Sequence, residues 1–179
     1  IHGLKKMGLT VLHTQATRLD DVARLLRLVG QASGHAAAGE TAARDVSARL
    51  AALQVRGTQK PPVSVFYQVW DRPLMTVGGT HWISDALALC GARNVFADLR
   101  AASPVVSREA VLRRAPALIV GGSDAPGLRR PWQRFAGLPA VKNDAFVRVN
   151  ADLLHRPTPR LIEGVAELCA AVAPWSLVQ

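Results

Sequence analysis

The histidines, cysteines and serines of the chain show none of the spacings that build a common catalytic or metal site. No His-x-His or His-Glu-x-x-His pattern is present, so we expect no metal ion, and no Gly-x-Ser-x-Gly nucleophile turn occurs. Cys90 and Cys169 lie near apolar stretches, where a structural thiol or a disulfide is expected rather than a nucleophile, and two cysteines leave both states open. The sequence therefore predicts a protein that is not an enzyme and uses no catalytic cofactor. The histidines are His2, His13, His35, His81 and His155.

Three loops combine polar or large side chains with turn residues, and each follows a stretch that we predict to be a strand. The first, residues 70–82, carries Trp70, Trp82 and the pair Gly78-Gly79. Large amphipathic side chains beside a closely approaching backbone suit a bulky, partly apolar ligand. The alternative is that the two tryptophans complete the core and the glycine pair forms a turn.

The other two loops differ in the chemistry that they could support. Residues 120–127 are rich in glycine, as phosphate-binding loops are, but they match neither Gly-x-Gly-x-x-Gly nor the P-loop pattern. An ordinary tight turn is therefore the better interpretation. In residues 150–160, two prolines hold Asp152, His155 and Arg156 in a rigid turn, whose polar groups could form hydrogen bonds with the amide arms of a ligand.

The elements that would position these loops alternate between strands and helices. Such alternation predicts an α/β fold with a mainly parallel sheet covered by helices on both faces. Folds of this kind bind ligands at the carboxyl ends of their strands, which is where the loops lie. The predicted strands span residues 63–69, 105–106, 118–120 and 146–149, and the predicted helices span residues 80–90, 108–114, 127–135 and 160–173.

The part of the chain before residue 57 has a different pattern. Asp20 could cap a helix that ends at Gly30, and a longer helix is predicted from residue 37 to about residue 55. Residues 9–12 have the pattern of a short buried strand. The first residues include neither an initiator Met nor the apolar core of a signal peptide, so we expect an internal fragment. The polar, proline-stiffened stretch 57–62 is the best candidate for a domain boundary.

Composition limits the classes of protein to which the chain can belong. Its 179 residues are 49% hydrophobic and 20% charged, which is typical of a folded domain rather than of a disordered chain. The apolar runs are far shorter than the roughly 20 residues that cross a bilayer. The net charge of +9 comes from arginines spread over several predicted helices. A basic nucleic-acid-binding domain, suggested by Arg129-Arg130-Pro131-Trp132, is the alternative from another class.

Four motifs occur in a fixed order in the second part of the chain. They are Val65-Phe66-Tyr67-Gln68-Val69 with the loop after it, Leu89-Cys90-Gly91-Ala92-Arg93-Asn94-Val95-Phe96, Val105-Val106-Ser107-Arg108-Glu109-Ala110-Val111-Leu112, and Ala115-Pro116-Ala117-Leu118-Ile119-Val120. In these motifs, and in the turn formed by residues 152–160, the chain resembles the periplasmic cobalamin-binding proteins of ABC importers. The resemblance covers essentially the whole chain, and it implies two lobes joined by one long helix, each lobe a mainly parallel sheet flanked by helices.

The resemblance also implies a division of the chain and a role for it. Residues 1–36 would be what remains of an incomplete N-terminal lobe, residues 37–57 the interlobe helix, and residues 58–179 the C-terminal lobe. The protein would be periplasmic, with a signal peptide upstream of Ile1. It would capture cobalamin or a related corrinoid and deliver it to a permease dimer in the inner membrane, with no nucleic-acid partner. Haem and ferric siderophores are the alternative ligands of the same fold.

By position, the resemblance gives roles to single residues. Glu109 matches the exposed carboxylate that docks on arginines of the permease. A disulfide between Cys90 and Cys169 is implied as well, in keeping with an oxidising periplasm. Met75 and Ser103 stand where well-known cobalamin binders have aromatic residues, a departure for which Trp70, His81 or Trp82 could compensate. The expected ligand contacts are Trp70, Arg72, Pro73, Met75, Ser103, Asp152 and Arg156.

Overall fold

The computed structural model describes residues 2–54, 61–122 and 127–177. Its central feature is a sheet with the strand order β4-β1-β5-β6, in which every neighbouring pair is parallel, as the alternating pattern predicts. β1 and β5 lie in the middle and are almost entirely buried, because most of their residues are apolar and elements pack on both of their faces. The strands are β1 (Val63–Gln68), β4 (Ala92–Asn94), β5 (Leu118–Gly122) and β6 (Phe146–Val149).

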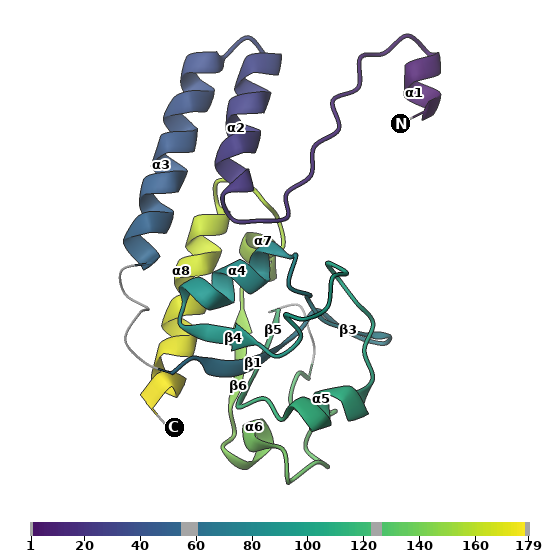
Figure 1. Ribbon diagram of the computed structural model, residues 1–179, viewed down its shortest axis with the longest axis vertical. Coiled ribbons are helices and arrows are strands. Elements are labelled where there is room, and N and C mark those ends of the chain that lie inside the picture. The colour runs from purple at the N-terminus through teal and green to yellow at the C-terminus, as the bar shows by residue number, and fades with distance from the viewer. Residues whose placement is uncertain (1, 55–60, 123–126, 178–179) are drawn as a thin grey trace.

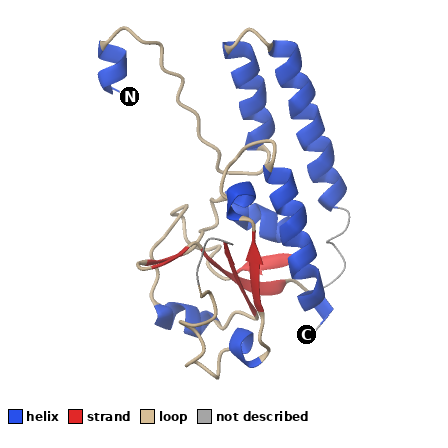
Figure 2. Cartoon of the chain, turned by 180° about the vertical axis from the view of Figure 1, so that it is seen from behind, coloured by secondary structure: helices blue, strands red, loops and turns tan. Residues whose placement is uncertain are grey.

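Helices cover both faces of this sheet. In Figures 1 and 2, α4, α7 and α8 lie on one side, and α5 and α6 lie on the other. This confirms the predicted α/β class. The helices are α4 (Trp82–Leu89), α5 (Arg108–Arg114), α6 (Pro139–Lys142), α7 (Ala151–Leu154) and α8 (Leu161–Val172), which the 3-10 turn η1 (Ala173–Leu177) extends.

Two long antiparallel helices stand beside the sheet domain (Figure 1). They are α2 (Asp21–Ala32) and α3 (Ala36–Gln54), and the lower part of α3 also contacts α8. α2 and α3 approach closely at Gly30 and Gly39, where a Cβ atom on Gly30 would lie 2.8 Å from the Cα atom of Gly39. The predicted helix over residues 37–55 is therefore confirmed up to residue 54, and its last residue lies outside the described part of the chain.

A disulfide joins Cys90, at the end of α4, to Cys169 in α8, with a Cα–Cα distance of 4.6 Å. This confirms the pairing that the family resemblance implies. Gly91 follows with a positive φ of 75°, as expected of a helix end. No helix in the described part of the chain is both long and apolar enough to span a membrane.

Several local predictions before α3 differ from the structure. Asp20 stands at the N-cap of α2 as predicted, but its side chain makes no capping hydrogen bond, and Asp21 accepts the upstream backbone N–H groups of Thr17 and Arg18 at 2.7 and 3.0 Å. α2 continues past Gly30 to Ala32, and the missing side chain of Gly30 allows α3 to pack closely there. Residues 9–12 form no strand and are largely exposed, since no described strand lies beside them to pair with their backbone. They lead from the isolated short helix α1 (His2–Lys6) to α2 (Figure 1).

Two predictions in the sheet domain also differ from the structure. Residues 127–135 form successive turns rather than a helix, because Pro131 lacks the N–H group that a helix interior needs. Residues 105–106 form only an isolated bridge, in which Val105 pairs with Met75. The amide of Val106 donates to the carbonyl of Leu74 at 2.9 Å, so the segment lies along β3 (Leu74–Met75) and not in the parallel sheet.

Candidate functional site

The candidate site lies at the edge of the sheet where the parallel strands end. Gln68 of β1 pairs with Gly121 of β5, and Gly122 of β5 pairs with Val149 of β6, so these strand ends are in register. The first and third loops of the sequence analysis leave the sheet at this common edge. The glycine-rich loop begins there too, but residues 123–126 lie outside the described part of the chain. The predicted position of the loops is therefore confirmed for the two that the structure describes.

The first loop folds back on itself as a short hairpin of β2 (Trp70–Asp71) and β3 (Leu74–Met75). Trp70 pairs with Met75 across the hairpin and is 58% exposed, although its Nε1 donates a hydrogen bond of 3.0 Å to the carbonyl of Arg72. Arg72 and Pro73 form the exposed tip. Four of the expected ligand contacts thus share one exposed hairpin.

Ser103 lies near this hairpin. The amide of Thr76 donates to the carbonyl of Pro104 at 3.1 Å, and Val105 bridges to Met75. These contacts fix the segment around Ser103 along β3, and Ser103 itself is exposed. Both positions at which the family resemblance expects aromatic residues therefore lie on neighbouring chain segments.

The third loop is fixed to the end of β1 and to α4. The hydroxyl of Tyr67, on β1, lies 2.9 Å from Nε2 of His155, and Nε1 of Trp82 donates to the carbonyl of Leu154 at 3.0 Å. Asp152 and Arg156 form an exposed ion pair of 3.1 Å. The structure brings this turn to the same sheet edge as the hairpin, but no hydrogen bond or ion pair of the described residues joins Asp152 or Arg156 to the hairpin.

The pair Gly78-Gly79 serves internal packing. A Cβ atom on Gly78 would lie 2.0 Å from the carbonyl oxygen of Ala101, and one on Gly79 would lie 2.1 Å from that of Ala97. The amides of both glycines donate hydrogen bonds to the same segment. The glycine pair is thus explained without a ligand, whereas exposed Trp70 does not complete the core as the alternative interpretation required.

His81 connects the first loop to α4 and is neutral near pH 7. Its Nδ1 accepts the N–H of Ile83 at 3.1 Å, which caps the helix. Partial burial, and secondarily the nearby His155, lowers the pKa of His81 from 6.5 to about 4. Its ring also lies 4.1 Å from that of Trp82. Protonation would remove the lone pair that caps α4.

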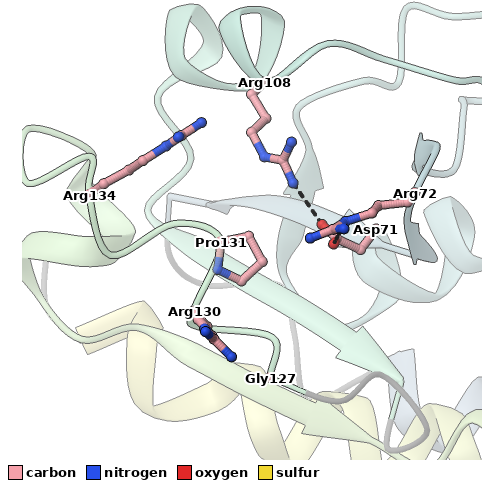
Figure 3. A pocket seen from close by; sticks show the side chains of 7 residues that line it. All are labelled: Asp71, Arg72, Arg108, Gly127, Arg130, Pro131 and Arg134. Atoms are coloured by element: carbon pink, nitrogen blue, oxygen red, sulfur yellow. Dashed lines mark hydrogen bonds and ion pairs between the residues drawn. The ribbon is translucent and has the colours of Figure 1, made fainter.

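A second feature of this region was missed by the sequence analysis. A pocket of about 710 Å³ is surrounded by Arg72, Arg108, Arg130 and Arg134, and Asp71 is the acidic side chain that the described residues contribute to its wall (Figure 3). Nη2 of Arg108 donates to Oδ1 of Asp71 at 2.8 Å. We call these five residues the arginine pocket. Gly127 and Pro131 complete its wall.

Trp132, in the motif Arg129-Arg130-Pro131-Trp132, offers no stacking surface. Trp132 is fully buried, and its Nε1 donates to Oε1 of Gln68 at 2.8 Å. A buried indole cannot stack on a nucleotide base, so the motif that suggested nucleic-acid binding has a structural explanation.

Glu109 lies in the first turn of α5, as predicted. Ser107 caps this helix, because its Oγ accepts the N–H of Ala110 at 3.1 Å. The backbone N–H of Glu109 and the Ser107 hydroxyl hold the pKa of Glu109 below its usual value. The carboxylate is therefore ionised and exposed at neutral pH.

Residues 5–153 match the sequence model that describes the periplasmic binding proteins. The chain belongs to the periplasmic binding protein family. Within this family it is 35% identical to the vitamin B12-binding protein of Vibrio cholerae over 93% of the chain, and 31% identical to that of Pectobacterium atrosepticum over 97%. The chain spans 60% and 63% of the length of these two relatives.

Solved structures of the family have the same fold. The crystal structure of the periplasmic vitamin B12 binding protein BtuF of Vibrio cholerae matches with a TM-score of 0.82 and 33% identity, covering 97% of this chain and 68% of that one. The periplasmic heme-binding protein BhuT in complex with two hemes matches with a TM-score of 0.77 and 20% identity, covering 97% and 69%. The second likeness concerns the fold alone.

Proposed function

We propose that the chain is the larger part of a substrate-binding protein that captures cobalamin or a related corrinoid for an ABC importer. The observation that carries this proposal is the identity of 35% to a vitamin B12-binding protein over nearly the whole chain. The fold supports it, because an exposed tryptophan hairpin and a polar turn lie at the sheet edge where α/β folds bind ligands. As a binding protein it would use no catalytic cofactor, and cobalamin would be its cargo.

Haem or a ferric siderophore is the second candidate ligand. It is supported by the likeness of the fold to the heme-binding protein BhuT, at lower sequence identity than to the vitamin B12-binding proteins. Both candidates are large, flat or compact chelates with apolar faces and polar edges, so an exposed Trp70 could contact either one.

In the proposed site the hairpin supplies the apolar surface and the third loop supplies the polar groups. The ring of Trp70 would lie against the corrin, flanked by Met75 and Ser103, with Arg72 and Pro73 at the rim. Asp152 would accept hydrogen bonds from amide N–H groups of the corrin arms. Arg156 would donate to their carbonyl oxygens.

We further propose that residues 1–36, 37–57 and 58–179 belong to the N-terminal lobe, the interlobe helix and the C-terminal lobe. In support, the sheet domain begins at β1, and α3 is a continuous helix of 19 residues. A helix of this length spans roughly 28 Å and resists bending, so the two lobes would close only slightly on a ligand.

We propose that Glu109 docks the protein on a permease dimer in the inner membrane. An exposed, ionised carboxylate in a first helical turn can accept a bidentate contact from an arginine. Glu109→Ala should leave cobalamin affinity nearly unchanged and weaken association with the permease. Glu163→Ala is the matched control, because Glu163 is an exposed acid in the first turn of α8. Loss of ligand affinity with permease binding intact would instead place Glu109 in the ligand site.

A periplasmic location completes the proposal. The disulfide between Cys90 and Cys169 supports it, since disulfides persist in oxidising compartments.

Substitution of Trp70 tests the proposed site. Trp70→Ala should weaken cobalamin binding about tenfold or more in a calorimetric titration, because it removes the largest exposed apolar surface of the hairpin. Trp70→Phe is the matched control, since it keeps an aromatic face, and it should retain most of the affinity. Unchanged affinity in Trp70→Ala would move the ligand away from the hairpin.

A further inference from the structure

The arginine pocket carries more positive charge than the described residues neutralise. Oδ1 of Asp71 accepts from Arg108 at 2.8 Å, and Oδ2 lies 3.4 Å from Nε of Arg72. Arg130 and Arg134 form no ion pair with any described residue. Among the described residues that line the cavity, four guanidinium groups thus face one carboxylate, which pairs with only two of them.

The arginines also have hydrogen-bond donors to spare. Nε of Arg108 is buried and has no hydrogen-bond partner among the described residues, so Asp71 satisfies only part of this side chain. Figure 3 shows the side chain of Arg134 directed toward Arg108 across the pocket. The guanidinium of Arg134 lies over the ring of Phe135, 4.8 Å from its centroid, in a cation–π contact. Guanidinium forks of this kind match the oxygens of a phosphate or a carboxylate.

The arginine pocket and the proposed corrin surface share one hairpin. Asp71 pairs with Leu74 in it and Trp70 pairs with Met75, so the pocket and Trp70 belong to opposite faces of the hairpin. Arg72 lies at the exposed tip and also lines the pocket, so a ligand on Trp70 would reach the pocket with a side arm that passes this tip. The cavity of about 710 Å³ is large enough for a side arm of a ligand.

The anionic group of a complete corrinoid is the phosphodiester of its nucleotide loop, whereas its other side arms end in neutral amides. We propose that the arginine pocket binds this phosphodiester and thereby favours complete corrinoids over those that lack the nucleotide loop. The inference rests on the proposed function and adds to it the part of the ligand that is recognised by charge. Arg130 and Arg134 are the principal contacts, because neither is engaged by a described acid.

The test compares two corrinoids in two proteins. Affinities for cyanocobalamin and for dicyanocobinamide, which has no phosphodiester, are measured by calorimetry for the full-length parent protein and for its Arg130→Gln/Arg134→Gln variant. The double variant should lose about tenfold or more in cyanocobalamin affinity, because charge-assisted hydrogen bonds are removed. Its dicyanocobinamide affinity should change by less than about twofold, because no phosphate contact exists to lose.

Arg129→Gln is the matched control. Arg129 neighbours the pocket in sequence but pairs with Asp144 at 2.6 Å and does not line the cavity. The Arg129→Gln substitution removes one positive charge near the pocket, so an effect of net charge alone would also lower the cyanocobalamin affinity of this variant. An Arg130→Lys variant, which keeps the charge and loses the fork, should fall between the parent chain and Arg130→Gln in cyanocobalamin affinity.

Inorganic phosphate distinguishes the two possible sources of the anion. Phosphate that competes with cyanocobalamin, and not with dicyanocobinamide, would support the proposal. Phosphate that binds without displacing cyanocobalamin would identify a site for a free oxyanion and overturn it. An equal loss of affinity for both corrinoids in the double variant would overturn it while leaving the proposed function intact. Failure of the full-length protein to bind either corrinoid would remove the proposed function and this inference together.

Discussion

The fold should lose stability as the pH falls from about 6.5 toward 4, because His81 is held neutral in the folded chain. Its pKa is lowered to about 4, whereas an unfolded histidine titrates near 6.5. Between these two values the unfolded chain binds a proton that the folded chain does not. Stability is therefore complete above the unfolded pKa, falls through this window, and reaches its lower limit below the folded pKa.

The size of this loss follows from the same two values. At pH 5 the full shift would correspond to about 2 kcal/mol relative to pH 7.5. His81 is only partly buried, so water screens part of the effect, and we expect about 1 kcal/mol. The nearby His155 adds to the shift, and Asp85 of the same helix is already paired with Arg18 at 2.9 Å.

Urea unfolding at pH 7.5 and pH 5 measures the effect, and His81→Asn isolates it. Asparagine caps helices well and does not titrate, so the variant should keep α4 and lose the contribution of His81 to the pH dependence. The many exposed acids titrate equally in both proteins and cancel in the comparison. If both proteins lost the same free energy of unfolding between the two pH values, the burial of neutral His81 would be refuted.

Two further predictions concern the contacts between helices: the disulfide that joins α4 to α8, and the close approach of α2 and α3. Reduction of the disulfide between Cys90 and Cys169 should lower the free energy of unfolding by about 4.5 kcal/mol in the chain-entropy model, since 79 residues separate the cysteines. Urea unfolding with and without reductant measures this loss, and a loss below about 1 kcal/mol would contradict the prediction. Gly39→Ala should cost about 1–3 kcal/mol, because the new Cβ would lie 2.7 Å from the carbonyl oxygen of Leu26. Gly3→Ala, with open space around it, is its control, and equal effects of the two would refute the close helix contact.

The sequence predicted best those features that depend on neighbouring residues. Ser107 caps α5 and Gly91 ends α4 because a helix boundary is decided by the residues at that boundary. The parallel sheet was also predictable, since alternating apolar strands and helices allow few other arrangements. Asp20 does stand at the N-cap of α2, but the local pattern does not show that its side chain makes no capping hydrogen bond.

The features that were missed depend on residues far apart in the chain. The arginine pocket joins Arg72, Arg108 and Arg130, which belong to three separate segments, and only the fold brings them together. Nothing in the spacing of these residues marks them among the other arginines. The exposed state of residues 9–12 likewise depends on which strands lie beside them, which an apolar run cannot reveal.

Binding of cobalamin is the central claim, and a ligand comparison tests it most directly. The purified protein is titrated calorimetrically with cyanocobalamin, haem and a ferric siderophore under the same conditions, and its absorbance spectrum is recorded after removal of unbound ligand. The account predicts that cyanocobalamin is the ligand retained, with the highest affinity of the three. Retention of haem or the ferric siderophore without binding of cyanocobalamin would contradict it.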